Sequence, residues 1–318
     1  MFNSITKVAV IGTGVIGAGW IIRALAHNKK VTAYDKDIKL KKKLVNEIKR
    51  TWPYVKKLFN KKKLNLKNFK YVVSIEEALE EALTDADFIQ ECATENYAIK
   101  TKLMSTIGKY SKPNAIISSS SSGLLPTRIY SKCKNPARTM IGHPFNPVYI
   151  CPGVEIVPGK KTKKKFLNRA NKFYKSISMN PIMVKKELPG YLADRLQEAL
   201  WREALHIVNE GYASTKDLDR AIEDGPGLRW SLMGVFLTYH LAGGKAGMKH
   251  MLEQFGPALK LPWTKLKAPT LSKKLSSRVI EGTRQQAKGK SVAMISNVRD
   301  EYLVNLQKLR KKFEKKIR

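Results

Sequence analysis

Residues 8–17 read Val-Ala-Val-Ile-Gly12-Thr-Gly14-Val-Ile-Gly17, a short apolar run that leads into three glycines with the spacing GxGxxG. The apolar run is typical of a buried parallel strand, and the residues that follow have the composition of a helix. In such a unit the first glycine allows a tight turn, the second lets the backbone approach a pyrophosphate, and the third lets the helix pack on the strand. The helix start presents N–H groups to phosphates. The stretch therefore predicts a dinucleotide-binding turn made by Gly12, Gly14, Val15, Ile16 and Gly17.

The second apolar run, residues 31–34, ends at Asp35, eighteen residues after Gly17. A carboxylate about 20 residues past such a turn accepts hydrogen bonds from the adenosine ribose and repels a 2′-phosphate. This position favours NAD over NADP as the cofactor. The alternative interpretation is a packing turn followed by an ordinary surface aspartate.

The remainder of the first 188 residues alternates short apolar runs with helical periods, which is typical of a parallel sheet with crossover helices. Pro53 interrupts the helical composition of residues 37–59 and predicts a kink or a split there. After Pro189 and Gly190 the pattern becomes helical throughout. We expect a Rossmann-type doubly wound α/β domain over 1–188 and an all-α domain over 189–318. The predicted strands are 7–11, 31–34, 71–73, 87–91, 115–118, 139–142 and 181–184.

The composition is strongly basic, with 60 Lys and Arg against 26 Asp and Glu and a formal net charge of +34. A basic surface of this kind suits a polyanion such as nucleic acid. The lysine runs are scattered, however, over 41–43, 61–63, 160–165 and 311–316, and no nucleic-acid-reading motif accompanies them. A general lysine bias is therefore favoured, and nucleic acid is not the expected partner.

Neither a secretion signal nor an apolar run long enough for a membrane span is present in this sequence. The cysteines are odd in number and lack CxxC spacing, which favours reduced thiols in a cytoplasmic protein over disulfides or a metal site. They are Cys92, Cys133 and Cys151.

A second informative stretch, residues 142–147, reads Gly-His143-Pro-Phe-Asn-Pro and precedes the strand-like run 154–157, which contains Glu155. Oxidation of an alcohol needs a base for the hydroxyl proton, and histidine suits that task near neutral pH. A buried carboxylate needs a partner, because leaving it unpaired is costly. The two residues therefore predict a His–Glu pair, although a lone histidine is more often structural.

These motifs resemble the 3-hydroxyacyl-CoA dehydrogenase superfamily over nearly the whole chain, with the greatest similarity to its carnitine dehydrogenase branch. The strings that carry the resemblance are SSSSSGLLP (118–126), GHPFNPVY (142–149), PGYLADRLQEALWREALHIVNEG (189–211), LRWSLMGVFLTYHLAGGKAGMKH (228–250) and QFGPALKLPWTKL (254–266). The later strings point to the carnitine branch.

The resemblance implies that His143 is the general base and that Glu155 orients it, while Ser122 hydrogen-bonds the substrate oxygen. It places Glu95 and Lys100 beside the nicotinamide and ribose, and it implies a homodimer formed through the helical domain. Asp194 departs from the acyl-CoA enzymes, which have an amide there. That departure indicates a different charge in the substrate pocket.

Carnitine carries a quaternary ammonium, which aromatic faces and a nearby carboxylate hold best. Asp194, Glu198 and Trp201 have the spacing i, i+4 and i+7 and would share one face of a helix. Core packing is the alternative for each aromatic candidate. The further candidates are Phe145, Asn146, Trp230, Phe236 and Tyr239.

The expected reaction is oxidation of the 3-hydroxyl of L-carnitine to 3-dehydrocarnitine with NAD. Alternatives are an L-3-hydroxyacyl-CoA dehydrogenase, an L-gulonate dehydrogenase-like enzyme and, outside enzymes, a basic polyanion-binding protein.

Overall fold

The computed structural model describes residues 4–61, 63–73, 77–267, 269–270 and 272–317. Residue 62 of the lysine run 61–63 lies outside this range. Contacts divide the chain into two compact units, Met1–Arg195 and Leu196–Arg318. The predicted domain boundary after residue 188 stays a prediction.

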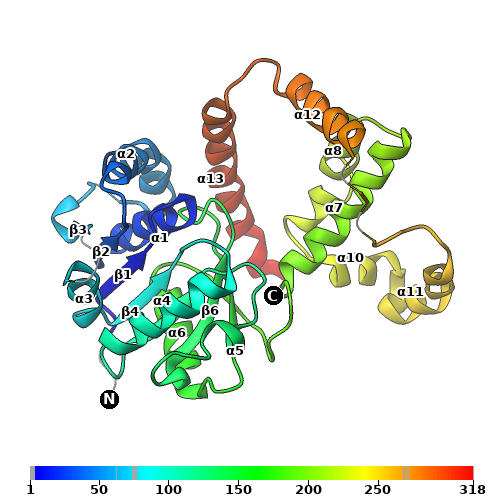
Figure 1. Ribbon diagram of the computed structural model, residues 1–318. Helices are drawn as coiled ribbons and strands as arrows, with labels where there is room; N and C mark the ends of the chain where they lie inside the picture. Colours follow the sequence, from blue (N-terminus) through cyan, green and yellow to red (C-terminus); the bar gives the residue numbers. More distant parts are fainter. Residues whose placement is uncertain (1–3, 62, 74–76, 268, 271, 318) are drawn as a thin grey trace. The chain divides into compact units, whose positions relative to one another are not determined.

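The first unit is built on a β-sheet with helices around it (Figure 1). The sheet has eight strands in the order β3-β2-β1-β4-β5-β6-β7-β8. All neighbouring strands are parallel except β6 and β7, which are antiparallel. The strands are β1 (Lys7–Ile11), β2 (Lys30–Tyr34), β3 (Phe69–Val72), β4 (Phe88–Glu91), β5 (Ile116–Ser119), β6 (Thr139–Pro144), β7 (Gly153–Pro158) and β8 (Asn180–Met183).

All seven predicted strands are present, with ends that shift by at most two residues. Strand β7 was not one of the seven predicted strands, although its residues 154–157 were described as a strand-like run. The strand order reverses beside β1, so the carboxyl ends of β1, β4 and β5 border one crevice, where ligands of doubly wound sheets bind. The predicted doubly wound α/β fold is confirmed.

Helices cover both faces of the sheet. On one face α1 packs on α2, and the rings of Trp20 in α1 and Tyr174 in α6 lie 5.4 Å apart. On the other face α4 packs on α3 and α5. The helices are α1 (Val15–Ala26), α2 (Lys39–Phe59), α3 (Glu77–Thr84), α4 (Tyr97–Tyr110), α5 (Pro126–Ile129) and α6 (Lys164–Ser176), with short 3₁₀ turns at Leu66–Asn68 (η1) and Pro136–Arg138 (η2).

Helix α2 runs through Pro53 as one element, so the chain is not split there, and the other predicted outcome, a kink, stays a prediction. Pro53 is exposed, so the carbonyl of Lys49, which loses its helical donor, can bind water instead.

The central strands of the sheet contribute buried residues to the core of the first unit. Ala9, Ile89, Ile117 and Ile141 come from β1, β4, β5 and β6 and are each at most 1% exposed. Full burial of a large aliphatic side chain contributes roughly 1.5–3 kcal/mol. Because both faces are covered, each of these strands has a run of consecutive apolar residues, with polar residues near the carboxyl ends of β4, β5 and β6, and these short apolar runs are the pattern that identified the strands.

All secondary-structure elements in the described part of the second unit are helices or 3₁₀ turns, as predicted for an all-α domain. Helix α7 begins at Ala193, directly before the division between the units. None of the helices in the described ranges is long and apolar enough to cross a membrane. The elements are α7 (Ala193–Glu210), α8 (Thr215–Glu223), α9 (Pro226–Trp230), α10 (Val235–Ala242), η3 (Gly244–Ala246), α11 (Gly247–Phe255), η4 (Gly256–Lys260), α12 (Lys273–Ala287) and α13 (Val292–Ile317).

Candidate active site

The glycine turn joins β1 to α1 and has the geometry that its sequence predicts. Gly12 has a φ of +97°, and a Cβ there would lie 2.7 Å from the carbonyl oxygen of Cys92. A Cβ at Gly17 would lie 1.9 Å from the oxygen of Gly12, so only glycine lets the helix pack this closely. A Cβ at Gly14 meets nothing within 4 Å. The open space beside Gly14 fits a bound dinucleotide.

Asp35 follows β2 and lies against this turn. Its Oδ2 accepts hydrogen bonds from the amide of Thr13 at 2.8 Å and from its hydroxyl at 2.9 Å. The structure thus brings Asp35 to the glycine turn, at the edge of the sheet where the strands end.

His143 and Glu155 lie directly opposite each other in the antiparallel pair of β6 and β7. Opposite residues of such a pair point to the same face, so the register itself brings the two side chains together. His143 Nδ1 lies 2.8 Å from Glu155 Oε2, and the residues are 5% and 0% exposed. Glu155 therefore holds one ring nitrogen and leaves Nε2 for other partners.

The second oxygen of Glu155 binds the start of helix α7. Oε1 accepts hydrogen bonds from the amides of Leu192 at 2.9 Å and Ala193 at 3.1 Å. These amides belong to the first helical turn, where N–H groups lack partners within the helix. The carboxylate is thus fixed by three hydrogen bonds, and the start of α7 is tied to the His–Glu pair.

Tyr191 lies beside this pair in the left-handed region, with a φ of +47°. Its ring centroid is 5.6 Å from that of His143, and its hydroxyl donates to the carbonyl of Leu124. Burial raises the pKa of Tyr191, so its phenol stays protonated at neutral pH.

Two further predicted substrate residues border the His143 ring. Asp194 Oδ2 lies 3.8 Å from His143 Nε2, and the Phe145 ring packs edge-on at 5.4 Å between centroids. Asn146 is exposed in the loop that follows β6. The exposed part of the imidazole therefore lies beside a carboxylate and an aromatic ring.

Glu95 and Lys100 belong to a network of ion pairs and hydrogen bonds at the carboxyl ends of β4 and β5. Lys100 is 1% exposed, and its Nζ donates to Glu91 at 2.8 and 3.0 Å and lies 3.5 Å from Glu95 Oε2. Glu95 in turn accepts hydrogen bonds from the Ser121 hydroxyl and, at 3.0 Å, from the amide of Ser122. Ser122 itself is exposed. The network fixes the backbone that carries Ser122.

Glu91 is the buried carboxylate of this network and is not among the residues predicted from the sequence. It is 0% exposed and also accepts hydrogen bonds from the Ser119 hydroxyl and from the amide of Ala93. A carboxylate at the end of a buried strand was the available signal, because such a group needs a partner.

The remaining substrate candidates belong to the second unit, and their part in the site stays a prediction. Trp201 is 50% exposed and Phe236 is 83% exposed, so they are surface side chains of that unit rather than core. Glu198 lies 3.9 Å from Arg202, one turn along α7. Trp230 and Tyr239 are 41% and 48% exposed, at the end of α9 and within α10.

The cysteine beside the glycine turn is not an activated nucleophile. Cys92 Sγ lies 3.2 Å from the Ser120 hydroxyl, and burial raises the pKa of its thiol to about 12. Within the described ranges, no three His, Cys, Asp or Glu side chains gather as a metal site.

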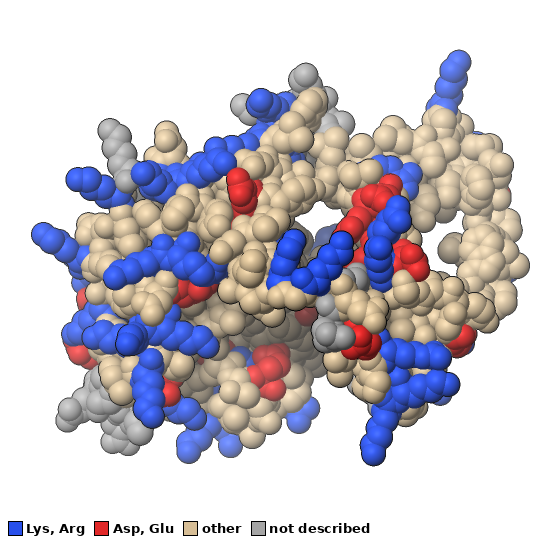
Figure 2. Space-filling model, turned by 90° about the horizontal axis from the view of Figure 1, so that it is seen from above, with Lys and Arg blue, Asp and Glu red and all other residues tan. Residues whose placement is uncertain are grey.

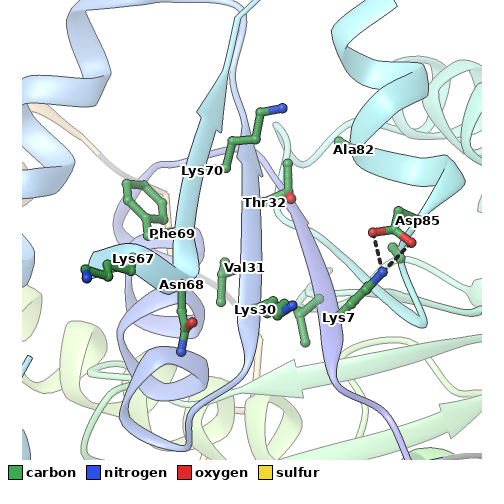
Figure 3. Close-up of a pocket in the computed structure, with 12 residues that line it drawn as sticks. Lys7, Lys30, Val31, Thr32, Lys67, Asn68, Phe69, Lys70, Ala82 and Asp85 are labelled. Atoms are coloured by element: carbon green, nitrogen blue, oxygen red, sulfur yellow. Dashed lines mark hydrogen bonds and ion pairs between the residues drawn. The ribbon is translucent and has the colours of Figure 1, made fainter. Parts of the chain in front are cut away.

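A cleft of about 260 Å³ opens at the amino ends of β1, β2 and β3 (Figure 3). In it Lys7 pairs with Asp85 at 2.6 Å, while Lys30 and Lys67 extend from neighbouring elements. Because ligands of doubly wound sheets bind at the carboxyl ends of the strands, we assign no chemistry to this cleft. Figure 2 shows Lys and Arg at many separate places on the visible face.

Comparison with models of protein families identifies the family of this chain. Residues 7–188 match the NAD-binding domain of 3-hydroxyacyl-CoA dehydrogenase, and residues 190–282 match its C-terminal domain. The chain belongs to the 3-hydroxyacyl-CoA dehydrogenase family. This family member is therefore an NAD-dependent dehydrogenase, and the predictions of an NAD cofactor and of a dehydrogenase acting on a secondary alcohol are confirmed.

Among curated proteins, the chain is 50% identical to an L-carnitine dehydrogenase of Oceanobacillus iheyensis, over 94% of this chain and 96% of the relative. It is 47% identical to one from Pseudomonas aeruginosa, over 95% and 93% of the two chains. The predicted resemblance to the carnitine dehydrogenase branch is thereby confirmed.

Solved structures share the fold at low identity. A 5-formyl-3-hydroxy-2-methylpyridine 4-carboxylic acid 5-dehydrogenase has a TM-score of 0.80 at 21% identity, covering 96% of this chain and 99% of that chain. The (S)-3-hydroxybutyryl-CoA dehydrogenase of Ralstonia eutropha has a TM-score of 0.63 at 22% identity, covering 90% and 95%.

Proposed function

We propose that this family member oxidises the 3-hydroxyl of L-carnitine to 3-dehydrocarnitine. The observation that carries the proposal is the 50% identity to a curated L-carnitine dehydrogenase over 94% of the chain. Similarity over this share of the chain includes the His–Glu pair and α7, and the match to the family's NAD-binding domain over residues 7–188 includes the glycine turn.

His143 acts as the general base in this proposal. Because Glu155 accepts a hydrogen bond from Nδ1, the imidazole carries its proton there and keeps a lone pair on Nε2. Nε2 takes the hydroxyl proton of the substrate, and Glu155 stabilises the imidazolium that forms. Bound NAD⁺ supplies the acceptor for the hydride that leaves the same carbon. Ser122 donates a hydrogen bond to the substrate oxygen from a backbone that Glu95 fixes.

Asp194 gives the pocket its preference for a cation. Its carboxylate lies 3.8 Å from His143 Nε2, so a substrate whose hydroxyl reaches Nε2 brings its neighbouring atoms close to this charge. A quaternary ammonium has no N–H to donate and is attracted by a carboxylate and by aromatic faces. Phe145 offers such a face, and Asn146 follows it in the same loop. Glu198, Trp201, Trp230, Phe236 and Tyr239 of the second unit stay predicted substrate residues.

The cofactor is held by the turn at the start of α1. Gly12, Gly14 and Gly17 shape the turn, and the first-turn amides, including those of Val15 and Ile16, face the pyrophosphate. Asp35 binds the adenosine ribose and excludes a 2′-phosphate. Glu95, in the loop that follows β4, and Lys100, in the first turn of α4, lie on the opposite side of the crevice.

The second unit serves dimerisation in this proposal. Large apolar side chains stand exposed on it, among them Phe236 at 83%, Leu259 at 86% and Trp263 at 75%. Exposed apolar groups in this number are typical of an interface that another chain covers. We infer a homodimer, and a cytoplasmic location fits the free cysteines.

Formation of NADH with L-carnitine, D-carnitine, 3-hydroxybutyryl-CoA and L-gulonate tests the proposal. We expect turnover with L-carnitine and none with its D enantiomer at the same concentration. Turnover of the CoA ester without L-carnitine oxidation would replace the proposal with a 3-hydroxyacyl-CoA dehydrogenase.

A further inference from the structure

The loop between β6 and β7 connects the two members of the His–Glu pair, and it packs on the cofactor helix α1. Its residues Val148, Tyr149 and Ile150 are at most 5% exposed. A Cβ at Gly19 of α1 would lie 2.7 Å from the Cβ of Val148, so helix and loop are in direct contact. The position of the loop on α1 is therefore coupled to the position of His143 and Glu155.

Arg23, buried in the first unit, makes the hydrogen bonds between helix α1 and this loop. It lies in the last turn of α1 and is 0% exposed. Its guanidinium donates to the carbonyls of Val148 at 2.7 Å and Cys151 at 2.9 Å, both in the β6–β7 loop. It also donates to Ile177 at 3.2 Å and Ser178 at 2.9 Å, directly before β8.

Burial of a guanidinium to hold a loop carries a large desolvation penalty. Burial lowers the pKa of Arg23 to about 9, which reflects the loss of hydration, and the side chain is still charged at neutral pH. None of the described carboxylates pairs with it. An apolar side chain would fill the space without this penalty, but it would not bind four carbonyls in fixed directions. The benefit of Arg23 is therefore geometric.

We propose that Arg23 is a positioning residue, which sets the distance between the cofactor turn at the start of α1 and the His143–Glu155 pair. The inference rests on the proposed roles of His143 and Glu155. Because α1 carries the glycine turn at one end and Arg23 at the other, one rigid helix relates the cofactor to the loop. Misplacement of a reacting group by about 1 Å lowers turnover by up to roughly 100-fold.

Arg138 provides a matched control. It is 2% exposed and likewise donates to backbone carbonyls, those of Gly108, Ser111, Lys112 and Ala115, and burial lowers its pKa as well. Its contacts lie around the α4–β5 turn, at the end of β6 remote from His143. Loss of Arg138 thus removes a comparable buried cation without releasing the β6–β7 loop.

The experiment compares Arg23→Lys and Arg23→Met with Arg138→Lys and Arg138→Met. Titration gives the number of NAD sites per chain and the NAD affinity, and turnover is expressed per NAD site for whichever substrate the wild type oxidises. For Arg23→Lys we expect unchanged NAD affinity, turnover per site lower by roughly 10- to 100-fold, and a displaced acid limb of the pH–rate profile. The Arg138 variants should keep the wild-type values per NAD site, even where fewer sites fold.

Wild-type turnover per site and an unmoved acid limb in Arg23→Lys would overturn the proposal. An equal loss in Arg138→Lys would also overturn it, because the effect would then be general destabilisation. If Arg23→Met does not fold, the lysine variant carries the test. Failure of the proposed function is seen separately, as a wild type that does not oxidise L-carnitine or a His143→Gln variant that keeps its turnover.

Discussion

The carboxylate of Asp194 lies 3.8 Å from Nε2 of His143, while Glu155 binds Nδ1 of the same ring at 2.8 Å. The imidazole thus lies between one carboxylate that orients it and another that borders its reactive nitrogen. We therefore expect Glu155 to act with His143 in proton transfer, and Asp194 to recognise the charge of the substrate.

Replacing Asp194 tests charge recognition. In Asp194→Asn we expect the KM for L-carnitine to rise by roughly 10-fold or more, since loss of a close ion pair is worth about 1–3 kcal/mol. Steady-state kinetics measures the change, with Asp85→Asn at the opposite edge of the sheet as the control. An unchanged KM would show that the ammonium is bound elsewhere.

Replacing His143 tests the base. His143→Gln should lower kcat by roughly 100- to 10,000-fold, the usual contribution of a general base, and leave NAD binding intact. Turnover and NAD titration measure the two effects, and His250→Gln, at an exposed histidine of α11, is the control. Near-normal turnover in His143→Gln would refute the assignment.

Replacing Glu155 tests both of its contacts. Glu155→Ala should destabilise the protein by about 3–5 kcal/mol, because buried donors lose their acceptor. Glu155→Gln keeps an oxygen for the amides of Leu192 and Ala193, so it should fold better and still lose turnover. Chemical unfolding and kcat separate the two. Equal stability of both variants with the wild type would argue against the inferred strength of these contacts.

Replacing Asp35 tests the choice of cofactor. Asp35→Ala should weaken NAD binding and reduce the preference against NADP, because the group that repels a 2′-phosphate is gone. Affinities for both cofactors are measured by titration, and Asp37→Ala, two residues along, is the control. If the ratio of the two affinities stays the same, another residue reads the ribose.

The stability of the first unit should fall at acidic pH because His27 is protonated more readily in the unfolded chain than in the folded one. Burial, with the nearby cations Arg23, Lys61 and Lys29, lowers the pKa of His27 from 6.5 to about 4. Between these values the unfolded chain binds a proton that the folded chain does not, so stability is lost as the pH falls through this range. After allowance for solvent screening, the loss is at most ~2 kcal/mol. Urea unfolding at pH 7 and pH 5 should show a smaller difference in His27→Gln, and an identical difference would exclude this histidine as the cause.

The sequence predicts much of the fold and individual residues of the site, and physical reasons explain the remainder. The central strands could be predicted because burial on both faces gives each of them a run of consecutive apolar residues. The pairing of His143 with Glu155 follows from antiparallel register, which requires knowledge of which strands are neighbours. Arg23 gave no signal, because a single arginine in a helix is usually exposed. The amides that bind Glu155 belong to the backbone and leave no trace in side-chain identity.

Isotope labelling tests directly whether a hydride is transferred from carbon 3 of L-carnitine to NAD⁺. L-carnitine deuterated at carbon 3 is incubated with NAD⁺ and the enzyme, and the mass of the NADH and the identity of the product are determined. We predict deuterated NADH together with 3-dehydrocarnitine, and the loss of both in His143→Gln. Absence of deuterated NADH, while 3-hydroxybutyryl-CoA supports NADH formation, would show that the enzyme is not an L-carnitine dehydrogenase.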